Sequence, residues 1–210
     1  MMEHSTYHKL VIAAANLLRQ KGYAGTGISD ILRSADVTRG SLYHHFPGGK
    51  SDLAIAASHY SADQLLKHIE AACKKAHAAG GDYQDAMIEL CKKIYEIYES
   101  NVNWRFMTVS ATLQDGGERN DLFCREARKL GEKIKLKAIA EGAKFGLSEE
   151  ESYMSLRKAM LMLEGGWLLG RVLNDPMPMQ SVLQFIEEEK MLQELRSQLS
   201  ATFVHDYSQP

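Results

Sequence analysis

The feature that most constrains this chain is the spacing of its apolar residues, which is helical almost from end to end. Leu10, Ala14, Leu17 and Leu18 form the first apolar stripe, and stripes of the same period recur along the sequence. No run of alternating apolar and polar residues is long enough to indicate a strand, and no internal repeat is found. The sequence therefore predicts an all-α protein with about nine helices.

Turn-forming residues divide this pattern. The first helix is expected to end at Lys21-Gly22, and short helices are expected over 28–35 and from Thr38 to about His45. The run Phe46-Pro47-Gly48-Gly49 then stops the third helix. Further helices are expected over 50–79, 83–100, around 104–113, 122–145, 149–173 and 180–202. Ser148 and Glu151 have the spacing of a capping box at the start of the helix over 149–173.

Composition narrows the possible classes of protein. The chain has 210 residues, 45% of them hydrophobic, which is enough for a sizeable core. Its three cysteines, Cys73, Cys91 and Cys124, form no Cys-x-x-Cys pair, so neither a disulfide framework nor a zinc ribbon is expected and a cytoplasmic location is favoured. The most apolar stretch, 159–173, contains Glu164 and Arg171 and is too short to span a bilayer, so no membrane association is expected.

Charge is distributed unevenly along the chain. The formal net charge is −2, yet residues 1–50 carry six basic against three acidic residues and four of the eight histidines. The rest of the chain is therefore acidic. A basic N-terminal segment on an acidic remainder indicates a polyanion as the partner of that segment.

The three short N-terminal helices have the spacing of a helix-turn-helix unit, in which the second helix of the pair enters a major groove. Val37, Leu42 and Phe46 can pack inward. The outward face would then hold small and polar residues that let the helix approach base edges, namely Arg39, Gly40 and Ser41. An arginine there can bind the O6 and N7 atoms of a guanine. Phosphates can accept from the side chains that follow, Tyr43, His44 and His45.

Residues 8–57 match a known pattern at many positions. The matching residues are Gly22-Tyr23, Thr26, Ile28-Ser29-Asp30-Ile31, the run Ala35 to Phe46, and Lys50-Ser51-Asp52-Leu53. This set resembles the DNA-binding domain of the TetR family of transcriptional repressors. The turn from Phe46 to Lys50 is most similar to the subgroup that responds to antibiotics such as lincomycin, or to flavonoids. The remainder of the chain is similar to the family in outline, with six helices and Leu163-Glu164-Gly165-Gly166 in the next-to-last one.

The resemblance implies a set of DNA contacts. Phosphate contacts are implied for Thr26, Tyr43, His44 and Lys50. Base reading is implied for Thr38, Arg39 and Ser41, with Gly40 in the same DNA-binding surface. Two positions depart from the pattern. Gly27 stands where the family commonly has Ser or Thr, so one hydroxyl contact is expected to be absent, and Asp36 stands where glycine is usual, although Asp tolerates a left-handed backbone.

The resemblance also implies the domain organisation. A helix-turn-helix DNA-binding domain is expected over 1–49, and a helical ligand-binding and dimerisation domain over 50–210. The helices over 149–173 and 180–202 would form a four-helix bundle with a second subunit, and Gly165, Gly166 and Gly170 suit close helix approach. Two recognition helices about 34 Å apart would bind a palindromic double-stranded DNA operator, from which a small hydrophobic or aromatic effector releases the dimer.

Aromatic and methionine side chains in the second domain suit a pocket for an apolar ligand, because thioethers and indoles adapt to varied shapes. The candidates are Trp104, Met107, Phe123, Met160 and Trp167, with Glu164 and Arg105 as polar anchors. Packing in the core is the alternative interpretation for each apolar candidate, and a solvated surface position is the alternative for Arg105.

Other functions have weaker support in the sequence. Gly48-Gly49-Lys50-Ser51 ends like a P-loop, but His44 stands where that motif needs glycine and no strand precedes it. No catalytic residue, metal site or cofactor is expected, because no spacing brings together a nucleophile with its base, or a set of ligands. The remaining alternative to a repressor is an all-helical small-molecule-binding protein or enzyme that does not bind DNA.

Overall fold

The computed structural model describes residues 5–99 and 120–206, and within these ranges the chain is all-helical, as predicted. Its helices are α1 (Thr6–Gly25), α2 (Ile28–Ala35), α3 (Arg39–His45), α4 (Lys50–Ala78), α5 (Tyr83–Glu99), α7 (Asn120–Gly142), α8 (Glu149–Leu173) and α9 (Met177–Asp206), with a short 3₁₀ turn at Ala143–Phe145. The short helix expected around 104–113 lies outside the described residues.

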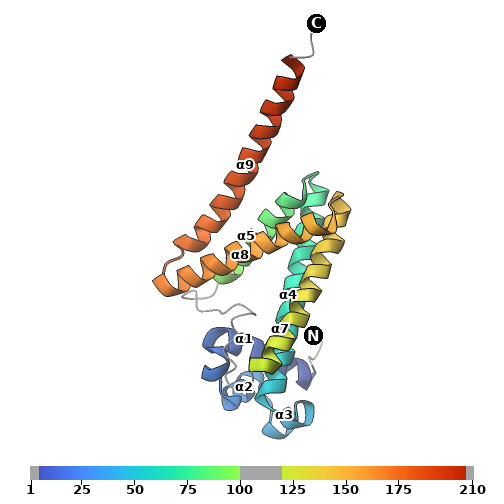
Figure 1. Ribbon diagram of the computed structural model, residues 1–210. Coiled ribbons are helices and arrows are strands. Elements are labelled where there is room, and N and C mark those ends of the chain that lie inside the picture. Colours follow the sequence, from blue (N-terminus) through green and yellow to red (C-terminus); the bar gives the residue numbers. More distant parts are fainter. Residues whose placement is uncertain (1–4, 100–119, 207–210) are drawn as a thin grey trace.

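Helices α1 to α3 form a small unit, here called the head, at one end of the molecule (Figure 1). Its core contains Leu10, Ile31 and Leu42, one from each helix. The same cluster continues along α4 as far as Ala62 and includes Phe123 of α7. The apolar core of the head therefore extends past residue 49, where the sequence places the domain boundary.

The turns of the head form where the sequence predicts them. Gly22 interrupts α1 with a φ of 72°, a backbone conformation that glycine adopts without a steric cost. Asp36 ends α2 in the left-handed region, with φ 53° and ψ 56°, as expected for an aspartate in place of glycine. Thr38 caps α3, because its side-chain oxygen accepts from the backbone N–H of Ser41. Local residues therefore fix the angle between α2 and α3.

Helices α4, α5, α7, α8 and α9 form the rest of the molecule, here called the body. In Figure 1, α4 and α7 run side by side away from the head. Three pairs link these two helices: His59 with Glu126 at 3.1 Å, Lys133 with Asp63 at 2.5 Å, and Lys137 with Glu70 at 2.7 Å. These three contacts therefore link α4 and α7 at successive positions along their length.

Helices α8 and α9 form the outer part of the body. The capping box predicted at Ser148 and Glu151 opens α8. Helix α9 begins three residues before the predicted range of 180–202 and ends four residues after it. The earlier start is possible because Pro178 lies in the first turn of the helix, where its missing N–H leaves no hydrogen bond unmade. The C-terminal part of α9 projects away from the other helices (Figure 1), and residues 191–198 are all exposed. None of the described helices has both the length and the hydropathy to cross a bilayer.

Candidate nucleic-acid interface and ligand pocket

Helix α3 presents two different faces. Leu42 is fully buried and Phe46, just after the helix, is 4% exposed, which confirms their predicted inward packing. The opposite face carries five exposed residues and the half-buried Ser41; the exposed ones are Thr38, Arg39, Gly40, Tyr43 and His44. All of the residues predicted on this helix for DNA contact therefore lie on its solvent side or at the edge of it.

Arg39 differs from two other basic residues of the head in its surroundings. Asp30 binds Lys21, at 3.3 Å, and Arg33, at 3.6 Å. Arg39 is exposed and has no ion-pair partner among the residues that the structure describes. Its guanidinium group can therefore bind an acceptor outside the protein without first losing a partner within the chain.

Gly40 is not required by packing within the chain. A Cβ atom built at this position would have one neighbour within 4 Å, the Thr38 Oγ1 atom at 3.9 Å. Gly49 contrasts with it, because its φ of 66° disfavours any other residue and a Cβ there would lie 3.4 Å from the Tyr43 ring. The space beside Gly40 is open on the solvent side, where it permits a close approach by another molecule.

Lys50 begins α4 and lies against the aromatic ring of Tyr23, with its Nζ atom 4.2 Å from the ring centroid. The hydroxyl of Tyr23 is 3.0 Å from the Ser51 hydroxyl, which fixes the ring against α4. Gly49 precedes the helix and supplies no side-chain cap. An ammonium group at a helix N-terminus is a favourable place for a phosphate.

Thr26 is a correction to the predicted phosphate contacts. Its side chain is 1% exposed, and its hydroxyl donates to the backbone carbonyls of Gly22, at 2.7 Å, and Leu17, at 3.2 Å. The interruption of α1 at Gly22 leaves carbonyl oxygens that need a donor, and Thr26 supplies it. The hydroxyl therefore stabilises the head and does not reach a phosphate.

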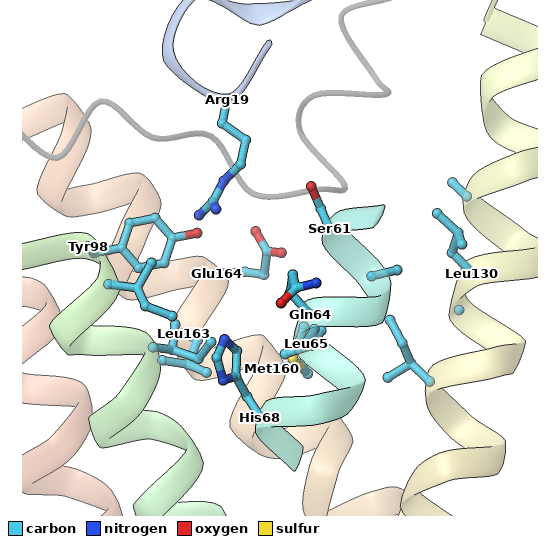
Figure 2. Close-up of a pocket in the computed structure, with 16 residues that line it drawn as sticks. Arg19, Ser61, Gln64, Leu65, His68, Tyr98, Leu130, Met160, Leu163 and Glu164 are labelled. Carbon is cyan, nitrogen blue, oxygen red and sulfur yellow. The ribbon is translucent and has the colours of Figure 1, made fainter. Parts of the chain in front are cut away.

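A cavity of about 170 Å³ lies where the head meets the body, with walls from α1, α4, α5, α7 and α8 (Figure 2). Most of its lining is apolar, with Leu65, Ile134 and Leu163 as examples. Two of the predicted pocket residues, Met160 and Glu164, line it. The cavity has the character of a small-molecule pocket, an apolar space with a few polar groups.

The other predicted pocket residues lie elsewhere. Trp167 packs in the core of the body, and Phe123 packs in the core of the head with its ring centroid 5.0 Å from that of Tyr23. Neither lines this cavity, so their assignment to the pocket is not supported and the alternative of core packing describes both. Trp104, Arg105 and Met107 lie outside the described residues.

Five polar lining residues were not predicted: Arg19, Ser61, Gln64, His68 and Tyr98. Burial raises the pKa of Tyr98 to about 12, so its hydroxyl stays protonated. Burial and the nearby charge of Lys93 lower the pKa of His68, which favours a neutral imidazole. A signal for part of this wall was present, because Ser61, Gln64, Leu65 and His68 are spaced as one face of a helix.

The comparisons with known proteins identify the family. The family model for bacterial regulatory proteins of the tetR family matches residues 10–57, which span α3 and the start of α4. Residues 10–57 therefore form a TetR-family DNA-binding domain. An uncharacterized HTH-type transcriptional regulator of Mycobacterium tuberculosis is 29% identical over 83% of this chain and 88% of its own length. The HTH-type transcriptional regulator LmrA of Bacillus subtilis is 26% identical over 86% of this chain and 94% of its own length.

The fold comparison agrees with the family assignment. A TetR transcriptional regulator from Legionella pneumophila superposes with a TM-score of 0.73 at 19% identity, covering 90% of this chain and 99% of that one. The family model and the curated relatives, which are named transcriptional regulators, make this chain a transcriptional regulator and not an enzyme. Among its described residues, no group of three His, Cys, Asp or Glu side chains is arranged to hold a metal ion.

Proposed function

We propose that this protein is a dimeric, ligand-responsive repressor that binds a palindromic double-stranded DNA operator in the cytoplasm. The observation that carries the proposal is the outward face of α3, with an exposed arginine beside an open glycine. Arg39 can donate to the O6 and N7 atoms of a guanine, and Gly40 lets the helix approach the base edges. Lys50, Tyr43 and His44 would bind the flanking phosphates.

Helix α8 supports a dimer through the body. Its exposed apolar residues include Met154, Leu161, Leu168 and Val172, which are between 51% and 72% exposed. With Gly165, where a Cβ would meet nothing within 4 Å, they form one continuous stripe at seven-, four- and three-residue spacing. Such a stripe is costly in water and is typical of a helix that packs against a partner. We infer that a second copy of the chain covers it.

Helix α9 continues the same surface. Phe185, Leu192 and Leu195 are about half exposed and lie on one side of the helix, at seven- and three-residue spacing. A pair of antiparallel helices from each of two copies would bury both stripes in a four-helix bundle. The bundle holds the two heads at a fixed separation, which a palindromic operator requires.

Helix α4 provides a route from the pocket to the DNA. Its first residue, Lys50, faces the proposed phosphate position, and its pocket residues begin at Ser61. Eleven residues of helix separate them, or about 17 Å. A small, largely apolar effector that shifts α4 would change the separation of the two heads. Moving the dimer from 1% to 99% released requires a preference of about 5.5 kcal/mol for the released form.

A fluorescence anisotropy titration with the DNA upstream of the gene for this protein, at two salt concentrations, tests the proposal. A repressor of this kind binds with an affinity that falls steeply with salt, because each phosphate contact releases counterions. Binding that is absent, or that does not depend on salt, would favour the alternative of an all-helical binding protein or enzyme without DNA binding. Response to an antibiotic or a flavonoid stays a prediction.

A further inference from the structure

The polar end of the pocket is shared between the head and the body. Arg19 comes from α1 in the head, whereas Tyr98 and Glu164 come from α5 and α8 in the body. Figure 2 shows the Arg19 side chain extending from the head toward the other two. Its Cζ atom lies 5.9 Å from the centroid of the Tyr98 ring. Arg19 is therefore a polar contact that joins α1 to the body.

The two residues that the body contributes to this wall, Tyr98 and Glu164, are of the kinds that bind a cation. Glu164 is the one carboxylate, and Arg19 the one permanent cation, among the described residues that line the cavity. Tyr98 offers both an aromatic face and a hydroxyl, and it lines the same end of the cavity as Arg19 and Glu164 (Figure 2). A carboxylate beside an aromatic ring is favourable for a cation. Without Arg19, this wall would carry a net negative charge.

We propose that Arg19 is an internal occupant of this cation site, and that a compact apolar amine displaces it and so detaches α1 from the body. The expected effect of the amine on DNA binding rests on the proposed function, whereas binding of the amine to the cavity does not. Arg19 and Glu164 line the same small cavity, and two cations held close together there repel each other, so the amine and Arg19 exclude each other from the site. Amine binding therefore weakens the attachment of α1 to the body, and this attachment weakens amine binding by the same factor.

The size of the cavity limits the amine. At about 170 Å³ it is close to an engineered apolar cavity of about 150 Å³ that accepts benzene. One aromatic ring with a short aminomethyl group therefore matches both the volume and the chemistry of the walls. Leu163, Met160 and Ile134 would contact the ring, and Glu164 would contact the ammonium group.

Isothermal titration calorimetry of the full-length protein with three ligands of similar shape and different charge tests the inference. The probes are benzylamine, which is a cation at pH 7, benzyl alcohol and benzoate. We expect benzylamine to bind about tenfold tighter than either of the others. Tighter binding of benzoate, or no difference among the three, would overturn the assignment of a cation site.

Two substitutions make the test specific. Glu164→Gln keeps the shape of the side chain and should abolish the preference for benzylamine. Arg19→Met keeps an apolar stem without the charge, removes the competitor, and should tighten benzylamine binding about tenfold. Weaker or unchanged binding of benzylamine to Arg19→Met would contradict the role of Arg19 as an occupant. Arg128→Met, at an exposed position on α7 that does not line the cavity, is the matched control, and thermal unfolding verifies that each variant is folded.

A DNA titration separates this inference from the proposed function. Saturating benzylamine should weaken binding of the wild-type protein to its upstream DNA and have a much smaller effect on Arg19→Met. If the wild-type protein does not bind DNA at all, the proposed function fails, while the calorimetric comparison still decides the cation site. If DNA binds and the order of the three probes is wrong, the cation site alone fails.

Discussion

The head and the body of this protein build their candidate surfaces in different ways. The head places its exposed arginine, glycine, tyrosine and histidine within one helix of seven residues, α3. The body builds its pocket from five helices, and one of these, α1, belongs to the head. A surface formed by one short helix depends on local sequence, whereas the pocket depends on the packing of the whole chain. The two regions should therefore respond differently to substitution.

The largest effect is expected at the surface of the body that would hold two heads together. Leu168→Glu places a charge in the middle of the α8 stripe and should weaken the dimer by about 3 kcal/mol or more, because the buried carboxylate would have no partner. Sedimentation velocity over a range of concentrations measures the dissociation constant. Leu136→Glu, at a leucine on α7 that is 63% exposed against 52% for Leu168, is the control and should leave the dimer intact. If the dimers of the two variants had the same dissociation constant, the α8 stripe would not be the dimer interface.

Two adjacent glycines of α8 distinguish packing within the body from packing between copies. A Cβ at Gly166 would lie 2.6 Å from Val182 Cγ2 and 3.2 Å from the carbonyl oxygen of Pro178, so Gly166→Ala should cost about 1–3 kcal/mol of unfolding free energy. Gly165→Ala meets nothing within 4 Å and should leave the folded subunit unharmed while weakening the dimer. Chemical denaturation at several protein concentrations separates the two effects. A Gly166→Ala variant as stable as the wild type would contradict the close packing of α8 on α9.

The head offers a similar test at Gly40. Alanine fits there without a clash in the chain and is the better helix former, so Gly40→Ala should keep or raise the stability, by up to about 1 kcal/mol. The added methyl group should weaken DNA binding by about 1 kcal/mol, or about fivefold, where the helix meets base edges. Thermal unfolding and anisotropy measure the two quantities. Unchanged DNA affinity would mean that this side of α3 does not approach DNA closely.

The smallest effect is expected at Asp36, in the turn between α2 and α3. Its left-handed backbone is easier for glycine than for aspartate, so Asp36→Gly should raise the unfolding free energy by less than about 1 kcal/mol. Chemical denaturation measures the change, and DNA affinity should stay the same because the geometry of the turn is already correct. A marked loss of stability would show that the aspartate side chain stabilises this turn.

The same contrast explains how much could be predicted from the sequence. The bounds of α2 and α3 and the left-handed Asp36 follow from residues within the turn itself, and the structure has them as expected. Arg19 could not be assigned to the pocket, because its contact with Tyr98 joins residues 79 positions apart. Thr26 was misassigned for a related reason. The family resemblance implies a phosphate contact for this residue, but the carbonyl oxygens left by the kink at Gly22 bind its hydroxyl inside the head.

The most direct test of the central claim, that α3 reads bases while the start of α4 binds phosphate, is to compare Arg39→Ala with Lys50→Ala. Both variants are titrated by anisotropy with the operator and with unrelated DNA, over a range of salt concentrations. Arg39→Ala should lose about 1–3 kcal/mol on the operator and most of its preference over unrelated DNA. Lys50→Ala should weaken both DNAs alike and reduce the salt slope by about one unit. An Arg39→Ala variant that binds the operator as tightly and as selectively as the wild type would contradict the account.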